Sequence, residues 1–177
     1  MTSPTNDLFT RRAPTAPSTA NDTDRSVEVV FSTGADVPRR DYDGEYLERL
    51  TISPDAVDLT AFIGAPILDN HAAHSIRNIL GAVESARIVG GEARARIKLS
   101  GRDDVSPIWS DIRDGIIQRV SVGYTVEEWT DQTDPRTGCR VRTAVRWTPR
   151  EISLVAIPAD RGAKFRNQEP HMPGQSY

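Results

Sequence analysis

The sequence predicts a mainly β protein with few helices, arranged as an antiparallel barrel or sandwich. About seven segments alternate apolar and polar residues, which is the period of a strand with one buried face. Turn signals such as Gly90-Gly91 separate several of these segments and join neighbours as hairpins. Only residues 104–115 carry clear helix signals. Parallel sheets need a helical crossover after most strands, so this pattern favours antiparallel pairing.

The first third of the domain is predicted to hold short strands between loops. Residues 26–31 alternate as a strand, and residues 34–40 read as a polar loop. Asp43-Gly44 is a turn signal before residues 46–52, which favour a strand. Asn70-His71 follows at the end of the apolar run 66–68.

A hairpin and a helix are predicted next. Residues 79–88 and 92–99 form the two strands around Gly90-Gly91, because the second segment alternates aliphatic and basic side chains. In the segment 104–115, Ser106 suits the N-cap and Pro107 suits the first helical position.

The last third is predicted to contain three strands. Residues 116–129 form the first, and residues 141–147 alternate apolar with basic or small side chains to form the second. Pro149 is expected to interrupt the chain, because proline cannot donate to a strand ladder. Residues 151–157 then make the final strand.

Length and composition indicate one domain with two tails. Residues 1–25 are rich in Ser, Thr, Pro, Asn and Asp, and we expect a disordered N-terminal tail, a folded domain over 26–166 and a flexible C-terminal tail over 167–177. A net charge of −3 gives no basic excess for nucleic acid, and no apolar run suits a membrane helix. The single Cys139 excludes an internal disulfide, so a reducing cytosolic setting is expected.

The stretch Val120-Ser121-Val122-Gly123-Tyr124 is the first candidate for chemistry. Side chains alternate along a strand, so the valines and Tyr124 share an apolar face while Ser121 and Gly123 share the other. A glycine beside the serine leaves room for another backbone to approach the hydroxyl. Ser121 is therefore either an ordinary strand serine or an accessible nucleophile.

His71, Ser121 and Glu151 together have the residue types of a base-assisted nucleophile. If the strands of Ser121 and Glu151 are neighbours, their small polar faces form one strip that His71 would have to reach. The imidazole would accept the serine proton, and the carboxylate would hold the tautomer and stabilise the imidazolium. The order His, Ser, acid along the chain is no obstacle, because geometry alone defines such a triad.

Other interpretations of these residues stay open. Each has an ordinary structural role available: a satisfied strand hydroxyl, a packed or surface histidine, and a solvated charge at a strand end. His71, His74 and Asp69 could instead hold a metal, although the set lacks a third histidine and a helical zinc motif. His74 also competes with Glu151 as the group that orients His71. No phosphate-binding glycine loop is present, and no cofactor is predicted.

Three motifs together resemble the tailed-phage prohead (procapsid) maturation protease family, which is related to the herpesvirus assemblins. The first is Asn70-His71 after an apolar run, followed by the glycine-containing strand 79–83. The second is Asp114-Gly115 followed by 120–124, and the third is 150–155 with Pro158-Ala159. The similarity covers roughly Val27 to Arg166.

The resemblance implies a serine endopeptidase on a small closed antiparallel β-barrel of about seven strands, assemblin-like, with peripheral helices. It implies Ser121 as nucleophile, His71 as general base and Glu151 as the third member. By the same analogy, backbone amides near Arg161-Gly162 would form the oxyanion hole. The added His74 in the segment after His71 departs from the family pattern.

The resemblance also implies a place of action and partners. Such a protease lies inside the immature capsid in the host cytoplasm, and cleaves scaffold, the scaffold-like region of the major capsid protein, and often itself. A homodimer or higher homo-oligomer is expected, with no membrane or nucleic-acid partner. The alternative from a different class is a catalytically weak scaffolding or structural module of capsid assembly.

Overall fold

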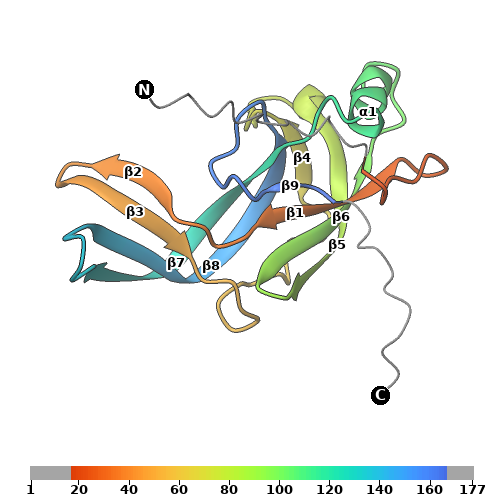
Figure 1. Cartoon of the computed structure of the whole chain (residues 1–177). Coiled ribbons are helices and arrows are strands. Elements are labelled where there is room, and N and C mark those ends of the chain that lie inside the picture. The colour runs from red at the N-terminus through yellow and green to blue at the C-terminus, as the bar shows by residue number, and fades with distance from the viewer. Residues whose placement is uncertain (1–16, 167–177) are drawn as a thin grey trace, which may run out of the picture.

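The computed structural model describes residues 17–166 as a strand-rich body with one α-helix (Figure 1). The predicted tails over 1–16 and 167–177 lie outside the described residues. The elements are β1 Ser26–Ser32, β2 Val37–Asp41, β3 Gly44–Leu50, β4 Pro66–Asp69, the 3-10 turn η1 Ile76–Asn78, β5 Ile79–Val89, β6 Glu92–Leu99, α1 Ser106–Arg113, β7 Val120–Thr133, β8 Arg140–Leu154 and β9 Lys164–Phe165.

The nine strands form one curled, half-barrel sheet, so the predicted closed antiparallel barrel of about seven strands is wrong. The order is β2-β3-β8-β4-β5-β6-β1-β9, and β7 pairs with β8 outside this path. Both β3 and β4 run parallel to β8, two pairs that a mainly antiparallel prediction did not identify. Between β9 and the start of β7 the pairing is one isolated bridge, Arg119 to Lys164. A two-residue β9 is too short to build a ladder there.

Several local predictions are confirmed. β5 and β6 pair as a hairpin around Gly90-Gly91, both of which have positive φ. β1 begins at Ser26, as expected. The predicted loop over 34–40 is wrong in its second half, because 37–41 forms β2 and pairs with β3. Figure 1 shows the β2–β3 hairpin and the far halves of β7 and β8 extending together away from α1.

The single α-helix begins one residue away from the predicted cap. Val105 is the N-cap, and the Ser106 hydroxyl donates to the Arg102 carbonyl oxygen at 3.2 Å instead of capping the helix. Pro107 lies in the first turn, as predicted, where its missing N–H costs nothing. Trp109 and Ile112 form the buried face. None of the helices within residues 17–166 is long and apolar enough to cross a membrane.

Strand β8 continues through Pro149, so the predicted interruption there is wrong. Gly123 pairs with Glu151 and Tyr124 pairs with Pro149, which leaves Arg150 as an extra residue in a bulge. The ladder is already broken at a bulge, so the missing proline N–H is tolerated. On the other edge of β8, β3 ends opposite Ala144 and β4 begins opposite Ile152, so Pro149 faces neither strand.

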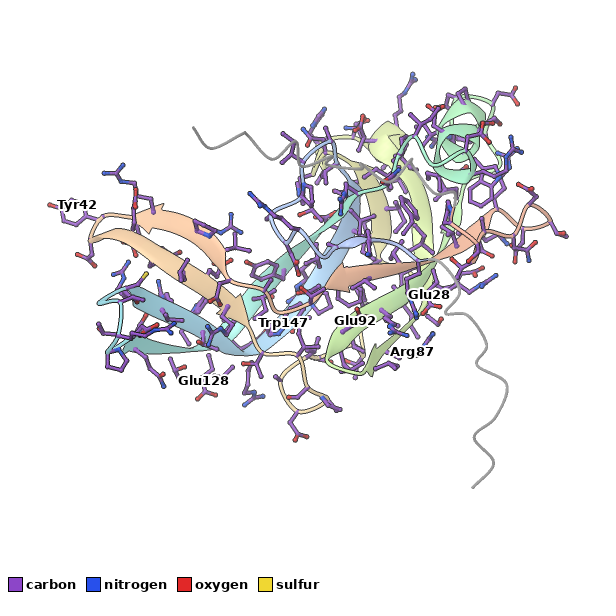
Figure 2. All side chains as sticks on the ribbon, in the orientation of Figure 1. Glu28, Tyr42, Arg87, Glu92, Glu128 and Trp147 are labelled. Carbon is purple, nitrogen blue, oxygen red and sulfur yellow. The ribbon has the colours of Figure 1, made fainter. Side chains whose placement is uncertain are left out.

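The concave side of the sheet holds the hydrophobic core. Its largest fully buried side chains include Trp147, Phe31, Ile67, Ile97 and Ile152. Figure 2 shows Trp147 near the middle of the molecule and Tyr42 at the tip of the β2–β3 hairpin. Burying each aliphatic or aromatic side chain of this size contributes roughly 1.5–3 kcal/mol.

Residues 17–25 pack on the body, although the sequence placed them in a disordered tail. Asn21 forms an isolated bridge with Ser26. The Trp109 indole N–H donates to Asp22 Oδ1 at 2.9 Å, and the Thr19 hydroxyl donates to the Arg166 carbonyl oxygen at 2.8 Å. Short polar side chains in this segment therefore bind it to parts of the chain that are distant in sequence. Amino-acid composition alone does not predict such contacts.

Candidate functional site

Strands β7 and β8 are paired neighbours. Their small polar residues therefore form the strip that was predicted for the case in which these strands lie side by side. Ser121 pairs with Ser153, and Gly123 pairs with Glu151. Directly opposed residues of an antiparallel pair project from the same face of the sheet. A hydroxyl from each strand and one carboxylate are thereby gathered at one end of the long β7–β8 ladder.

Gly123 leaves space for the Glu151 side chain. A Cβ atom on Gly123 would lie 3.0 Å from both Cγ and Cδ of Glu151 and closer still to Oε1. Such a contact is closer than Cβ atoms make in folded proteins, so any larger residue would displace the carboxylate. The sequence predicted a close backbone approach at this glycine; the group that occupies the space is a side chain.

His71 reaches the strip because β4 runs parallel to β8. Asp69 pairs with Leu154, and the Asn70 N–H donates to the Leu154 carbonyl oxygen at 3.0 Å. Asn70 and His71 both have positive φ, at 47° and 62°. This left-handed turn redirects the chain at the end of β4, and the His71 Nδ1 atom lies 2.6 Å from Glu151 Oε1.

Ser153 ties the histidine and the carboxylate together. Its hydroxyl donates to Glu151 Oε2 at 2.6 Å and accepts from the His71 backbone N–H at 2.9 Å. Ser153 is fully buried, so both hydrogen bonds are shielded from water. Sequence analysis did not select this residue as a site residue. The available signal was its position two residues after Glu151, which puts both side chains on one strand face.

The contact with Glu151 fixes the chemistry of the imidazole. A carboxylate accepts hydrogen bonds, so the neutral imidazole tautomer that fits this contact has its proton on Nδ1 and the lone pair on Nε2. The His71 side chain is 45% exposed, whereas that of Glu151 is 12% exposed. The arrangement therefore combines a half-buried orienting group with an accessible base.

Ser121 and His71 line the same pocket, which has a volume of about 180 Å³. No hydrogen bond is formed by the Ser121 hydroxyl within residues 17–166, so His71 and Ser121 share the cavity without a direct bond. Catalytic hydrogen bonds are often long in a free enzyme and shorten when substrate binds. Of the three predicted residues, the fold joins His71 to Glu151 and places Ser121 beside them.

A polar cluster around the buried Glu48 also lines this pocket. Glu48 Oε1 accepts from the Tyr124 hydroxyl and from Nε and Nη2 of Arg39, both at 3.2 Å. Burial, together with the hydrogen bond to Glu48, raises the pKa of Tyr124 to about 12. Sequence analysis missed Glu48 and Arg39, because they belong to β3 and β2 and come near β7 only through the β3–β8 pairing.

His74 and Asp69 lie away from the His71–Glu151 pair. The His74 Nε2 atom lies 3.3 Å from Asn78 Nδ2 and not beside His71 Nδ1, so Glu151 occupies the place for which the two residues competed. Asp69 lines a different pocket, with Ile116 and Leu154. Within the described part of the chain, no group of three or more His, Cys, Asp or Glu residues is placed to hold a metal ion.

The amides suggested for an oxyanion hole are partly engaged. The Gly162 N–H donates to Asp160 Oδ1 at 2.8 Å, so it is not free to meet a substrate. Asp160 also accepts from the Thr33 N–H at 2.6 Å and so ties this loop to the end of β1. Asp160 itself lines the pocket with His71 and Ser121.

One known protein relates this chain to phage capsids. Over 117 residues, or 64% of the chain, the sequence is 35% identical to the major capsid protein of Halomonas phage phiHAP-1. The chain spans about a fifth of that relative, since the match covers 19% of its length. No protein-family model and no solved structure matches the chain. The similarity supports a phage capsid-related protein, and membership of the protease family stays a prediction.

Proposed function

We propose that this chain is a serine endopeptidase that acts during phage capsid assembly. Ser121 is the nucleophile, His71 the general base and Glu151 the group that orients His71. The observation that carries this proposal is the 2.6 Å contact between His71 Nδ1 and Glu151 Oε1, at a pocket that Ser121 also lines. A strand hydroxyl, an accessible imidazole and a half-buried carboxylate in this order are the parts that acyl transfer requires.

The mechanism follows from the imidazole tautomer in which Nδ1 donates to Glu151 and Nε2 accepts. His71 Nε2 takes the Ser121 proton as Oγ attacks the scissile carbonyl carbon, and Glu151 stabilises the imidazolium that forms. The imidazolium then gives its proton to the leaving amine, and the C–N bond breaks. Water, activated by the same nitrogen, hydrolyses the acyl-serine and restores both residues. His71 must approach Ser121 for the first step, because the free structure has no bond between them.

The proposed substrates are the scaffold, the scaffold-like region of the major capsid protein, and the chain itself. Support comes from the similarity to a major capsid protein, because the relative carries a related segment within its own polypeptide. Action inside the immature capsid in the host cytoplasm, as a homo-oligomer, belongs to the same proposal. Enclosure raises the effective concentration of enzyme and substrate, so a slow protease suffices.

The second candidate is a structural or scaffolding module with little turnover. The comparison with known proteins favours this candidate over the enzyme, because the relative is named as a capsid protein and not as a protease. The missing Ser121–His71 hydrogen bond points the same way. In this case the His71–Glu151–Ser153 hydrogen bonds serve only to fasten the end of β4 to β8.

The two candidates differ in what Ser121 does. We would react the full chain with a fluorophosphonate probe for activated serines and compare Ser121→Ala with Ser85→Ala, which removes an exposed strand hydroxyl. The enzyme predicts labelling that Ser121→Ala and His71→Ala both abolish and Ser85→Ala retains. Coexpression with a capsid precursor should then give fragments only when Ser121 is present. Unlabelled protein, with precursor assembly unaffected by Ser121→Ala, would establish the structural module instead.

A further inference from the structure

The Glu48 carboxylate is asymmetrically bonded in the pocket beside Ser121. Tyr124 and Arg39 both donate to Oε1. No residue within 17–166 donates to the second oxygen, Oε2. Glu48 as a whole is 9% exposed, but Oε2 is not among the buried side-chain atoms of residues 17–166 that lack a partner, so this oxygen keeps contact with solvent. A ligand that fills the pocket would shield this acceptor from water, and an acceptor buried without a donor is costly, so a ligand that brings a donor is favoured.

The rest of the pocket suits an aliphatic chain. Phe31, Val37 and Leu50 contribute apolar surface from β1, β2 and β3. Ser121 and His71 line the same cavity. A substrate side chain that enters this cavity beside the reacting carbonyl would therefore meet both apolar surface and Glu48.

We propose that this cavity binds the substrate side chain that precedes the scissile bond, and that Glu48 Oε2 selects a chain ending in hydrogen-bond donors. The substrate class is therefore a peptide with glutamine or lysine at that position. The inference rests on the proposed protease function. A glutamate at the same position would bring a second carboxylate against Oε2, and a leucine would leave that oxygen unpaired.

The charge of Glu48 does not by itself decide between glutamine and lysine. The Arg39 guanidinium, which is 41% exposed, already balances the Glu48 charge from the Oε1 side. A neutral amide and an ammonium can each donate to Oε2. The shared feature is the donor at the end of an aliphatic stem, and substrates of both kinds belong in the test.

The test uses peptides of one sequence, taken from a cleavage junction mapped in a coexpressed capsid precursor. They differ only in the residue before the scissile bond, which is glutamine, lysine, glutamate or leucine. We expect kcat/KM of the wild-type chain to be at least about tenfold higher for glutamine and lysine than for glutamate and leucine. Equal rates, or faster cleavage of the glutamate or leucine peptide, would overturn the subsite.

The Glu48→Gln variant makes the test sharper. Arg39 and Tyr124 both donate, so the amide oxygen should take the place of Oε1 and the NH₂ group that of Oε2. The pocket would then present a donor, and the glutamate peptide should overtake the lysine peptide. Glu45→Gln is the matched control, because Glu45 lies on the same strand with an exposed side chain. An unchanged ranking in folded Glu48→Gln would contradict the assignment.

Fluorophosphonate labelling separates failure of the subsite from failure of the proposed function. The probe reports the Ser121 hydroxyl and lacks a peptide side chain. Labelling at Ser121 with no preference among the four peptides would reject the subsite and keep the protease. Absence of both labelling and cleavage would reject the protease and, with it, the subsite.

Discussion

The Glu151 carboxylate fills the space beside Gly123 that a Cβ atom of residue 123 would otherwise take. The two residues are paired across β7 and β8, so the glycine sets how the carboxylate is held over the sheet. From this position Glu151 reaches His71 Nδ1 at 2.6 Å. A residue without a side chain is therefore needed to position the orienting group of the candidate base.

We expect Gly123→Ala to displace Glu151 and to lower kcat by about a hundredfold or more, because a misplacement of about 1 Å has that effect on a catalytic group. Peptide cleavage and the rate of probe labelling measure the loss. Gly101→Ala is the control, since a Cβ there meets nothing within 4 Å. Wild-type turnover in Gly123→Ala would show that the Glu151–His71 contact is not required.

Removal of the Ser153 hydroxyl should separate catalysis from substrate binding. In Ser153→Ala, Glu151 Oε2 loses its donor and the His71 N–H loses its acceptor, and each buried group left unpaired costs about 1–3 kcal/mol. We expect a lower free energy of unfolding, a lower kcat and an unchanged KM, because Ser153 does not line the pocket. The pH–rate profile should also shift. A change in KM alone would assign Ser153 to substrate binding.

The raised pKa of Tyr124 predicts an alkaline loss of stability. Its folded-state pKa is about 12, against about 10 for an unperturbed tyrosine, so folding favours the neutral phenol. The stabilisation is complete below pH of about 10 and is lost as the pH rises through about 12. Near-ultraviolet absorbance should show that one of the four tyrosines ionises late.

Two variants assign that late ionisation. Tyr124→Phe should remove it, and Glu48→Gln should lower the pKa of Tyr124, because the hydrogen bond to Glu48 is the second cause of the shift after burial. Titration of Tyr124 at the pKa of an unperturbed tyrosine, about 10, would contradict the shielded hydrogen bond to Glu48.

Local patterns predicted most individual strands and the helix, but not how the strands pair. Alternation marked β1, β5, β6 and β7, and Gly90-Gly91 joined β5 to β6. The prediction at Pro149 was wrong because a proline indicates only that a backbone N–H is missing. It does not indicate whether the strand needs an N–H donor at that position. The parallel partners of β8 were not predicted. Alternation of apolar and polar residues specifies which face of a strand is buried, but not which strand lies beside it.

The sequence by itself determined the residue chemistry of the candidate site: a histidine at the end of an apolar run, a serine beside a glycine, and a glutamate at the start of an apolar segment. Only the tertiary structure decided that Glu151 rather than His74 lies against His71, that Ser153 holds both, and that Glu48 lines the same pocket. The physical reason is that these contacts join residues tens of positions apart. Pairing of β3, β4 and β7 with β8 creates them, and local propensity does not specify that pairing.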